Sequence, residues 1–271
     1  MATLTQLEYL INYTPSVLYL ITPLAVLLTV LVTFGIMQKS NEITAMKASG
    51  TGLSVDEARR GIHVGHDLVL HRALPASAGV HLEVRTVALD RRRAGATQTI
   101  EFTATSADGP LWSTRMTSLY LGVELDGEPS EVESPWPAPP TVAAPGGEAV
   151  ASTTTHVRPV DAHVYSECAR IWNPIHTDIV AARRAGLDNP ILHGTAILAR
   201  AVSLVTRMEA VDLAVIRRVG AQFSAQVALD TTIEARLLSR AAHTLTFDML
   251  LADGRAALRE AWLSTATVTP W

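Results

Sequence analysis

Two short motifs in the second half of the chain constrain the fold more than any other feature. Residues 173–176 (Asn-Pro-Ile-His) predict a tight turn that carries a histidine. Residues 191–195 (Ile-Leu-His-Gly-Thr) open an apolar segment that continues to about Ala210. Its apolar residues recur near helical spacing, which predicts a helix from about Thr195 with one buried face.

Alternation of apolar and polar residues with a period of two predicts strands on both sides of these motifs. The predicted strands lie at residues 67–75, 80–89, 98–106, 111–123, 218–229, 231–238, 244–251 and 256–268. A short helix is predicted over 179–185, with Thr177 or Asp178 as its N-cap and Gly186 after its end. One long helix packed on an antiparallel sheet is an α+β layer arrangement.

The two motifs resemble the active-site segment of the MaoC-like dehydratases, the R-specific enoyl-CoA hydratase type of the hot-dog family. The resemblance covers residues 61–271 and implies a double hot-dog fold, in which an antiparallel sheet wraps a central helix. The first repeat, at 55–127, lacks its opening strand and helix, so we expect it to be truncated. Residues 128–150 are rich in proline, glycine and glutamate, which predicts an exposed linker before the second repeat at 151–271.

The same resemblance implies a site at the start of the long helix. It assigns His176 and Asn173 to catalysis, and Gly194, His193 and Thr195 to substrate binding. His176 would take a proton from water, while backbone N–H groups at the helix start hold the thioester oxygen as it gains charge. We therefore predict that His176 and Gly194 face a common cleft. Structural roles are the alternatives: an Asx turn at Asn173, close helix–sheet packing at Gly194 and local packing at His193.

Ile171 stands where the family pattern, Gly-Asp-x-Asn-Pro-x-His, has its aspartate. Isoleucine cannot accept a proton, and losing one half of an acid/base pair costs about 10²–10⁴ in rate. Glu167, Asp178 and Asp188 are the nearby carboxylates that could substitute. The resemblance implies a dehydratase/hydratase of 2-enoyl or 3-hydroxyacyl thioesters of coenzyme A or acyl carrier protein, weakened by Ile171 and needing no other cofactor. The alternative is a non-catalytic hot-dog subunit that binds acyl thioesters or supports a heteromer.

The amino-terminal part of the chain has a different character. No charged residue occurs from Tyr9 to Gln38, and residues 16–36 form an apolar run long enough to cross a bilayer, which needs about 20 residues. Lys39 and Lys47 follow the run and no basic residue precedes it. The positive-inside tendency then predicts an anchor in the inner (cytoplasmic) membrane, with the hot-dog part in the cytoplasm. The same flanks and the length of the run argue against a signal peptide.

Residues 1–53 also resemble one membrane helix and the cytoplasmic coupling helix of LptF/LptG-type permeases of lipopolysaccharide export. The coupling helix corresponds to a short amphipathic helix predicted at 39–53. A membrane permease fragment is therefore a third functional interpretation. It is physically the weakest one, because a transport pathway needs several helices to line it.

Composition and residue spacing exclude other classes of function. The net charge of −4 gives no basic excess that would attract nucleic acid. The one cysteine, Cys168, excludes a disulfide framework and is expected to be a small buried thiol. His63, His66 and His71 lack acidic or cysteine partners at the spacing of a zinc site, so we expect no metal.

Two arginine pairs are the remaining candidates for contact with the substrate. Arg183-Arg184 and Arg217-Arg218 could meet the phosphates of coenzyme A, whereas exposed arginines with no such role are the alternative. The hot-dog sheet also offers a surface for a homo- or hetero-oligomer.

Overall fold

The computed structural model describes residues 61–74, 79–133, 135–142 and 147–266. The predicted membrane span at 16–36 and the amphipathic helix at 39–53 lie outside these ranges. Within the described ranges, no helix combines the length and the apolar character that crossing a membrane requires.

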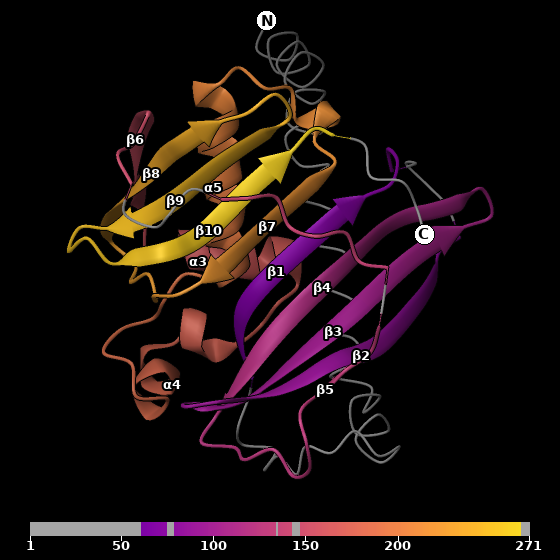
Figure 1. Cartoon of the computed structure of the whole chain (residues 1–271). Coiled ribbons are helices and arrows are strands. Elements are labelled where there is room, and N and C mark those ends of the chain that lie inside the picture. The colour runs from indigo at the N-terminus through magenta and orange to yellow at the C-terminus, as the bar shows by residue number, and fades with distance from the viewer. Residues whose placement is uncertain (1–60, 75–78, 134, 143–146, 267–271) are drawn as a thin grey trace, which may run out of the picture.

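A single antiparallel sheet of ten strands dominates the described part of the chain (Figure 1). Its strand order is β5-β2-β3-β4-β1-β7-β10-β9-β8-β6, so β1 and β7 join the strands of the first half to those of the second. The strands are β1 Ile62–Leu70, β2 His81–Arg92, β3 Gly95–Ser106, β4 Gly109–Leu121, β5 Ser130–Glu131, β6 Ala151–Val157, β7 Arg218–Phe223, β8 Thr231–Arg240, β9 Thr244–Leu251 and β10 Ala256–Ser264.

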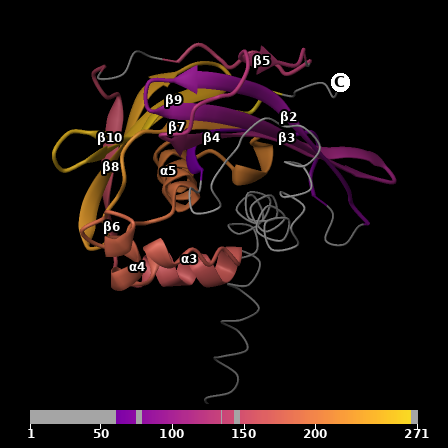
Figure 2. The same cartoon turned by 90° about the horizontal axis from the view of Figure 1, so that it is seen from below.

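The described helices all come from the second half of the chain, and the sheet curves around the longest of them (Figure 2). They are α3 Asp161–Ala169, the 3₁₀ turn η1 Pro174–His176, α4 Ile179–Arg184, α5 Gly194–Met208 and the 3₁₀ turn η2 Leu213–Val215. Helix α5 lies in the concave face of the sheet, and α3 and α4 cover the side of α5 that faces away from it. The predicted central helix wrapped by antiparallel strands is therefore found in the second half.

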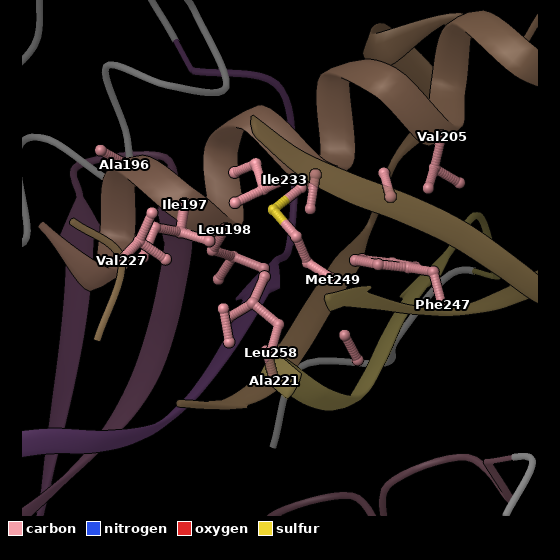
Figure 3. Packing of buried hydrophobic residues seen from close by; sticks show 14 of the residues in the cluster. Ala196, Ile197, Leu198, Val205, Ala221, Val227, Ile233, Phe247, Met249 and Leu258 are labelled. Carbon is pink, nitrogen blue, oxygen red and sulfur yellow. The ribbon is translucent and has the colours of Figure 1, made fainter. Parts of the chain in front are cut away.

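Burial of one face of α5 forms the larger core (Figure 3). Leu198, Ala201 and Val205 recur at intervals of three and four residues, so they line one side of the helix and are fully buried. They pack on side chains of the strands behind them, including Phe247 of β9. This apolar face holds the helix in place, since an isolated helix of this length is marginal in water.

The first half has a smaller core on the same concave side of the sheet. Most of its members are alternate residues of β3 and β4, which therefore point to one face, and Leu111 joins them where the β3–β4 register shifts. The buried members are Leu68, Ile100, Phe102, Ala104, Leu111, Trp112 and Met116. Ile171, from the loop after α3, packs against both this cluster and the core around α5. One side chain of the predicted site region thus links the two interiors.

The seam between the halves is the antiparallel pair β1 and β7. On the convex face, Arg218 of β7 donates two hydrogen bonds to the carboxylate of Asp67 on β1, at 2.9 and 2.6 Å. Arg218 also donates to the carbonyls of Pro137 and Ala138, and Trp136 donates its indole N–H to Asp67 at 2.8 Å. Because Arg218 is buried, this bidentate pair fixes the seam and anchors the segment after β5 to the sheet.

Several predicted boundaries differ from the structure, for physical reasons. The first strand runs from Ile62 to Leu70 rather than over 67–75, because its partner β4 pairs with it from Leu119 back to Trp112. Residues 161–169, for which no helix was predicted, form α3. The predicted linker at 128–150 is mostly exposed, but it contains β5 and the anchored Trp136.

Candidate functional site

His176 is held at the end of η1, directly after the tight turn that its sequence predicted. The side chain of Asn173 accepts a hydrogen bond from the N–H of Ile175 at 3.4 Å, and Pro174 occupies the first position of the turn. The His176 ring is buried, and its Nδ1 lies 2.8 Å from the carbonyl oxygen of Ile191. A carbonyl only accepts, so Nδ1 carries the proton and donates it. The Nε2 lone pair is then the basic atom of this imidazole.

His193 is the N-cap of α5, and its ring stacks on that of His176. The ring centroids are 3.6 Å apart and the planes differ by 24°. His193 is buried, and its Nε2 lies 3.3 Å from the hydroxyl of Ser166 on α3. Its Nδ1 forms no hydrogen bond of normal geometry with the described residues. The backbone carbonyl of Ile171 lies near this atom. The turn histidine and the start of the central helix are thus brought into direct contact.

Burial keeps both imidazoles neutral. It lowers the pKa of His176, and the hydrogen bond to the Ile191 carbonyl only partly opposes this. Burial also lowers the pKa of His193 to about 3, with a further contribution from the neighbouring His176. At neutral pH the pair therefore carries no charge, and His176 is in the form that can take a proton.

The first turn of α5 supplies donors beside the stacked rings. Helix geometry leaves the first N–H groups without intrahelical carbonyl partners, and the positive end of the helix dipole lies there. Gly194 opens the turn, and a Cβ at this position would lie 3.1 Å from the ring of Phe223, tighter than an ordinary contact. Thr195 is buried and accepts a hydrogen bond from the Tyr165 hydroxyl at 2.9 Å. This arrangement can hold an oxygen that gains negative charge.

None of the candidate carboxylates replaces the missing aspartate at His176. Glu167 is exposed and accepts a hydrogen bond from the Trp172 indole at 3.2 Å. Asp178 caps α4 by accepting from the N–H groups of Val180 and Ala181. Asp188 is exposed after the end of α4. Among the described residues, no carboxylate bonds to either ring of the stacked pair.

Two residues of the site were missed by the sequence prediction. Tyr165 and Ser166 lie on α3 and contact Thr195 and His193, respectively. The buried residues of α3, Ala162, Tyr165, Ser166 and Ala169, follow a helical spacing, but their face is too weakly apolar to give a clear signal in the sequence. The same spacing corrects the prediction for Cys168, which is exposed because it lies off the buried face of α3.

Outside this site, His63, His66 and Arg218 have structural contacts. His63 Nε2 donates to the Gly65 carbonyl at 2.9 Å, and His66 lies between His63 and Thr114. Burial lowers the pKa of His63 to about 4 and that of His66 well below its usual value. Of the two arginine pairs, Arg218 is buried against Asp67 and cannot reach a substrate phosphate.

Comparison with known families finds two unrelated matches in the chain. Residues 140–246 match the family model of the MaoC-like domain, which confirms the resemblance carried by the two motifs. Residues 2–54 match the model of the lipopolysaccharide export system permease LptF/LptG. A search of curated proteins finds no match.

Solved structures show the same hot-dog fold at low sequence identity. A MaoC-like dehydratase from Phytophthora capsici is 18% identical over 79% of this chain and 74% of its own, with a TM-score of 0.69. Peroxisomal multifunctional enzyme type 2 from Drosophila melanogaster is 20% identical over 82% of this chain but only 39% of its own, with a TM-score of 0.65. HtdX of Mycobacterium tuberculosis is 19% identical over 82% of both chains, with a TM-score of 0.58.

Proposed function

We propose that the protein is a hydratase/dehydratase of the MaoC-like type that interconverts 2-enoyl and 3-hydroxyacyl thioesters. One observation carries the proposal. A neutral imidazole, His176, has its Nδ1 bound to a carbonyl and its ring stacked at the N-cap of α5. A base and a set of oxyanion donors are thus neighbours, which is what addition of water to an enoyl thioester requires.

In the hydration direction, Nε2 of His176 takes a proton from water as the hydroxide oxygen bonds to the β-carbon of the enoyl group. The electron pair of the double bond moves through the α-carbon to the thioester oxygen, which the first N–H groups of α5 hold. The imidazolium then returns its proton to the α-carbon and the thioester carbonyl re-forms. One imidazole both takes and gives the proton, so the step balances without a second acid/base group.

A single base predicts a simple dependence of rate on pH. The pKa of His176 is lowered by burial, so the active neutral form is present at pH 7. Activity should fall as the pH is lowered through this pKa, which lies below 6.5, because protonation removes the base.

The test is hydration of crotonyl-CoA by the full-length protein, followed by loss of enoyl absorbance. His176→Ala should lower kcat by at least about 10². His163→Ala is the matched control, because His163 is exposed on α3, and it should leave the rate unchanged. Equal rates for the parent and His176→Ala would contradict the proposal.

Ile171→Asp tests the aspartate position directly. An aspartate beside the stacked pair would share the reacting water with His176, so kcat should rise. A newly buried carboxylate also costs stability, so the melting temperature is measured on the same sample. A folded variant with no gain would show that position 171 does not limit the reaction.

A non-catalytic thioester-binding subunit is the second candidate, favoured by Ile171 at the position of the family aspartate. It predicts that 3-hydroxybutyryl-CoA binds, as measured by calorimetry, while the parent shows no turnover.

A further inference from the structure

Helix α4, which follows His176 in the chain, presents an exposed face with two arginines. Val180, Arg183 and Arg184 are three and four residues apart, so their side chains lie on one side of the helix. All three are exposed, and Val180 keeps 54% of its accessible surface. Among the described residues, neither arginine forms an ion pair. Two guanidinium groups therefore face solvent with their donors available.

The carboxylates of this segment do not neutralise that face. Asp178 is bonded to backbone N–H groups at the opposite end of α4, and Glu167 is bonded to Trp172. Asp188 lies beyond the helix and pairs with neither arginine. Trp172 itself keeps 63% of its surface exposed, although a large aromatic side chain normally seeks burial. The loop after α3 and helix α4 therefore present an exposed aromatic ring and two arginines that form no ion pair with the described residues.

The length of helix between His176 and these arginines is comparable with the length of the arm of a thioester substrate. Helix α4 begins three residues after His176 and its six residues span about 9 Å. The pantetheine arm that separates a thioester from its phosphate matches about four residues of extended chain, roughly 14 Å. The long arginine side chains cover the remaining distance.

We propose that Arg183 and Arg184 bind the phosphate of the 4′-phosphopantetheine arm, with Trp172 packing against the arm. The proposal rests on the proposed function, because it concerns the other end of the same substrate. Paired guanidinium groups match the geometry of phosphate oxygens, and hydrogen bonds between ions are stronger than neutral ones. Coenzyme A and acyl carrier protein share this phosphate. Basic residues also stabilise the carboxyl end of a helix, but that role predicts no dependence on the substrate.

The experiment compares three crotonyl thioesters of increasing length: N-acetylcysteamine, which has only the sulfur end of the arm and no phosphate, 4′-phosphopantetheine and coenzyme A. The double variant Arg183→Gln/Arg184→Gln should raise KM about 10- to 100-fold for the two phosphate-bearing thioesters. KM for the N-acetylcysteamine thioester and kcat for all three should stay unchanged. Arg93→Gln is the matched control, because Arg93 is an exposed arginine in the turn between β2 and β3.

An equal change in KM for all three thioesters, or no change for any, would overturn the proposal. A larger change in KM with coenzyme A than with phosphopantetheine would identify coenzyme A as the molecule that carries the bound phosphate. A larger change with crotonyl-loaded acyl carrier protein would identify the carrier protein instead. If the parent shows no turnover, the proposed function fails separately. Calorimetric binding of free 4′-phosphopantetheine to the parent and the double variant then decides the role of the arginines, and equal affinities overturn it.

Discussion

The two halves of the sheet have mirrored strand orders, β5-β2-β3-β4-β1 and β7-β10-β9-β8-β6, but different interiors. In both, a buried carboxylate faces an arginine directly across the strand pair: Glu101 faces Arg85 in the first half, and Asp248 faces Arg236 in the second. The concave faces differ. Helix α5 fills the second, whereas the described residues of the first half contribute no helix to theirs.

The strand at the outer edge shows the same contrast. In the second half it is β6, with seven residues that precede the helices, and in the first half it is β5, with two residues that follow β4. The convex ion pair has the same position in both halves. The edge strand and the helix on the concave side differ between them. This difference indicates that the sheet is the shared scaffold and that the helix is the part that carries the site.

Truncation of a matched phenylalanine in each half is the largest test of this contrast. Phe247 and Phe102 are both fully buried, and removal of a buried phenylalanine ring costs about 3–5 kcal/mol of unfolding free energy. We expect Phe247→Ala to lose unfolding free energy at the upper end of this range, because α5 packs over Phe247. Phe102→Ala should lose an amount at the lower end. Urea unfolding measures both, with the exposed Leu121→Ala as a control of small effect. A reversed order would mean that the helix adds little to packing.

Removal of the buried carboxylates tests the feature that the halves share. Burial raises the pKa of Glu101, but its bonds to Arg85 and Arg115 outweigh that and lower it. Glu101→Gln should cost about 2 kcal/mol, below the 3–5 kcal/mol of a fully buried pair because Arg85 keeps solvent contact. Asp248→Asn should cost somewhat less, because Asp248 is bonded to one arginine, whereas Glu101 is bonded to two. Thermal unfolding of the two variants at one pH compares their losses of stability. A larger loss for Asp248→Asn than for Glu101→Gln would refute the predicted order.

The smallest effect concerns the buried histidines, which occur in both halves. His66 and His193 have folded-state pKa values below 6.5, so the unfolded chain binds more protons as the pH falls. Stability is therefore full above pH 6.5 and decreases below it, down to about pH 3 for His193. At pH 5.5 His193 should cost about 1 kcal/mol of unfolding free energy relative to pH 7.5, and His66 should act in the same direction. His66→Gln and His193→Gln should each reduce this slope in urea titrations, and slopes equal to the parent's would contradict the assignment.

The sequence predicted the elements whose pattern is strong. Alternation located β2, β3, β4 and β8 to β10, and helical spacing located α5. Of the two predicted N-caps of α4, Thr177 and Asp178, the structure uses Asp178. The contact between His176 and the start of α5 followed from two motifs that long-range packing brings together. The catalytic and binding roles of these residues stay predictions, as does the membrane anchor at 16–36.

The missed features depend on tertiary contacts. Strand β6 is rich in serine and threonine, so only its pairing with β8 defines it. Helix α3 has a weak apolar face, because polar Ser166 and Tyr165 serve the site rather than the core. The anchoring of Trp136 depends on Asp67 and Arg115, which lie far away in the sequence.

The seam between β1 and β7 also sets an order of assembly. Asp67 and Arg218 are 151 residues apart, whereas β2 to β4 and β8 to β10 are joined by short turns. Closing a loop of that length costs roughly 4 kcal/mol of chain entropy, before the pairing returns any of it. We therefore expect local hairpins to form early and the seam to close last. During synthesis, β1 must wait for the ribosome to release β7, so the first half spends that interval with an open sheet edge.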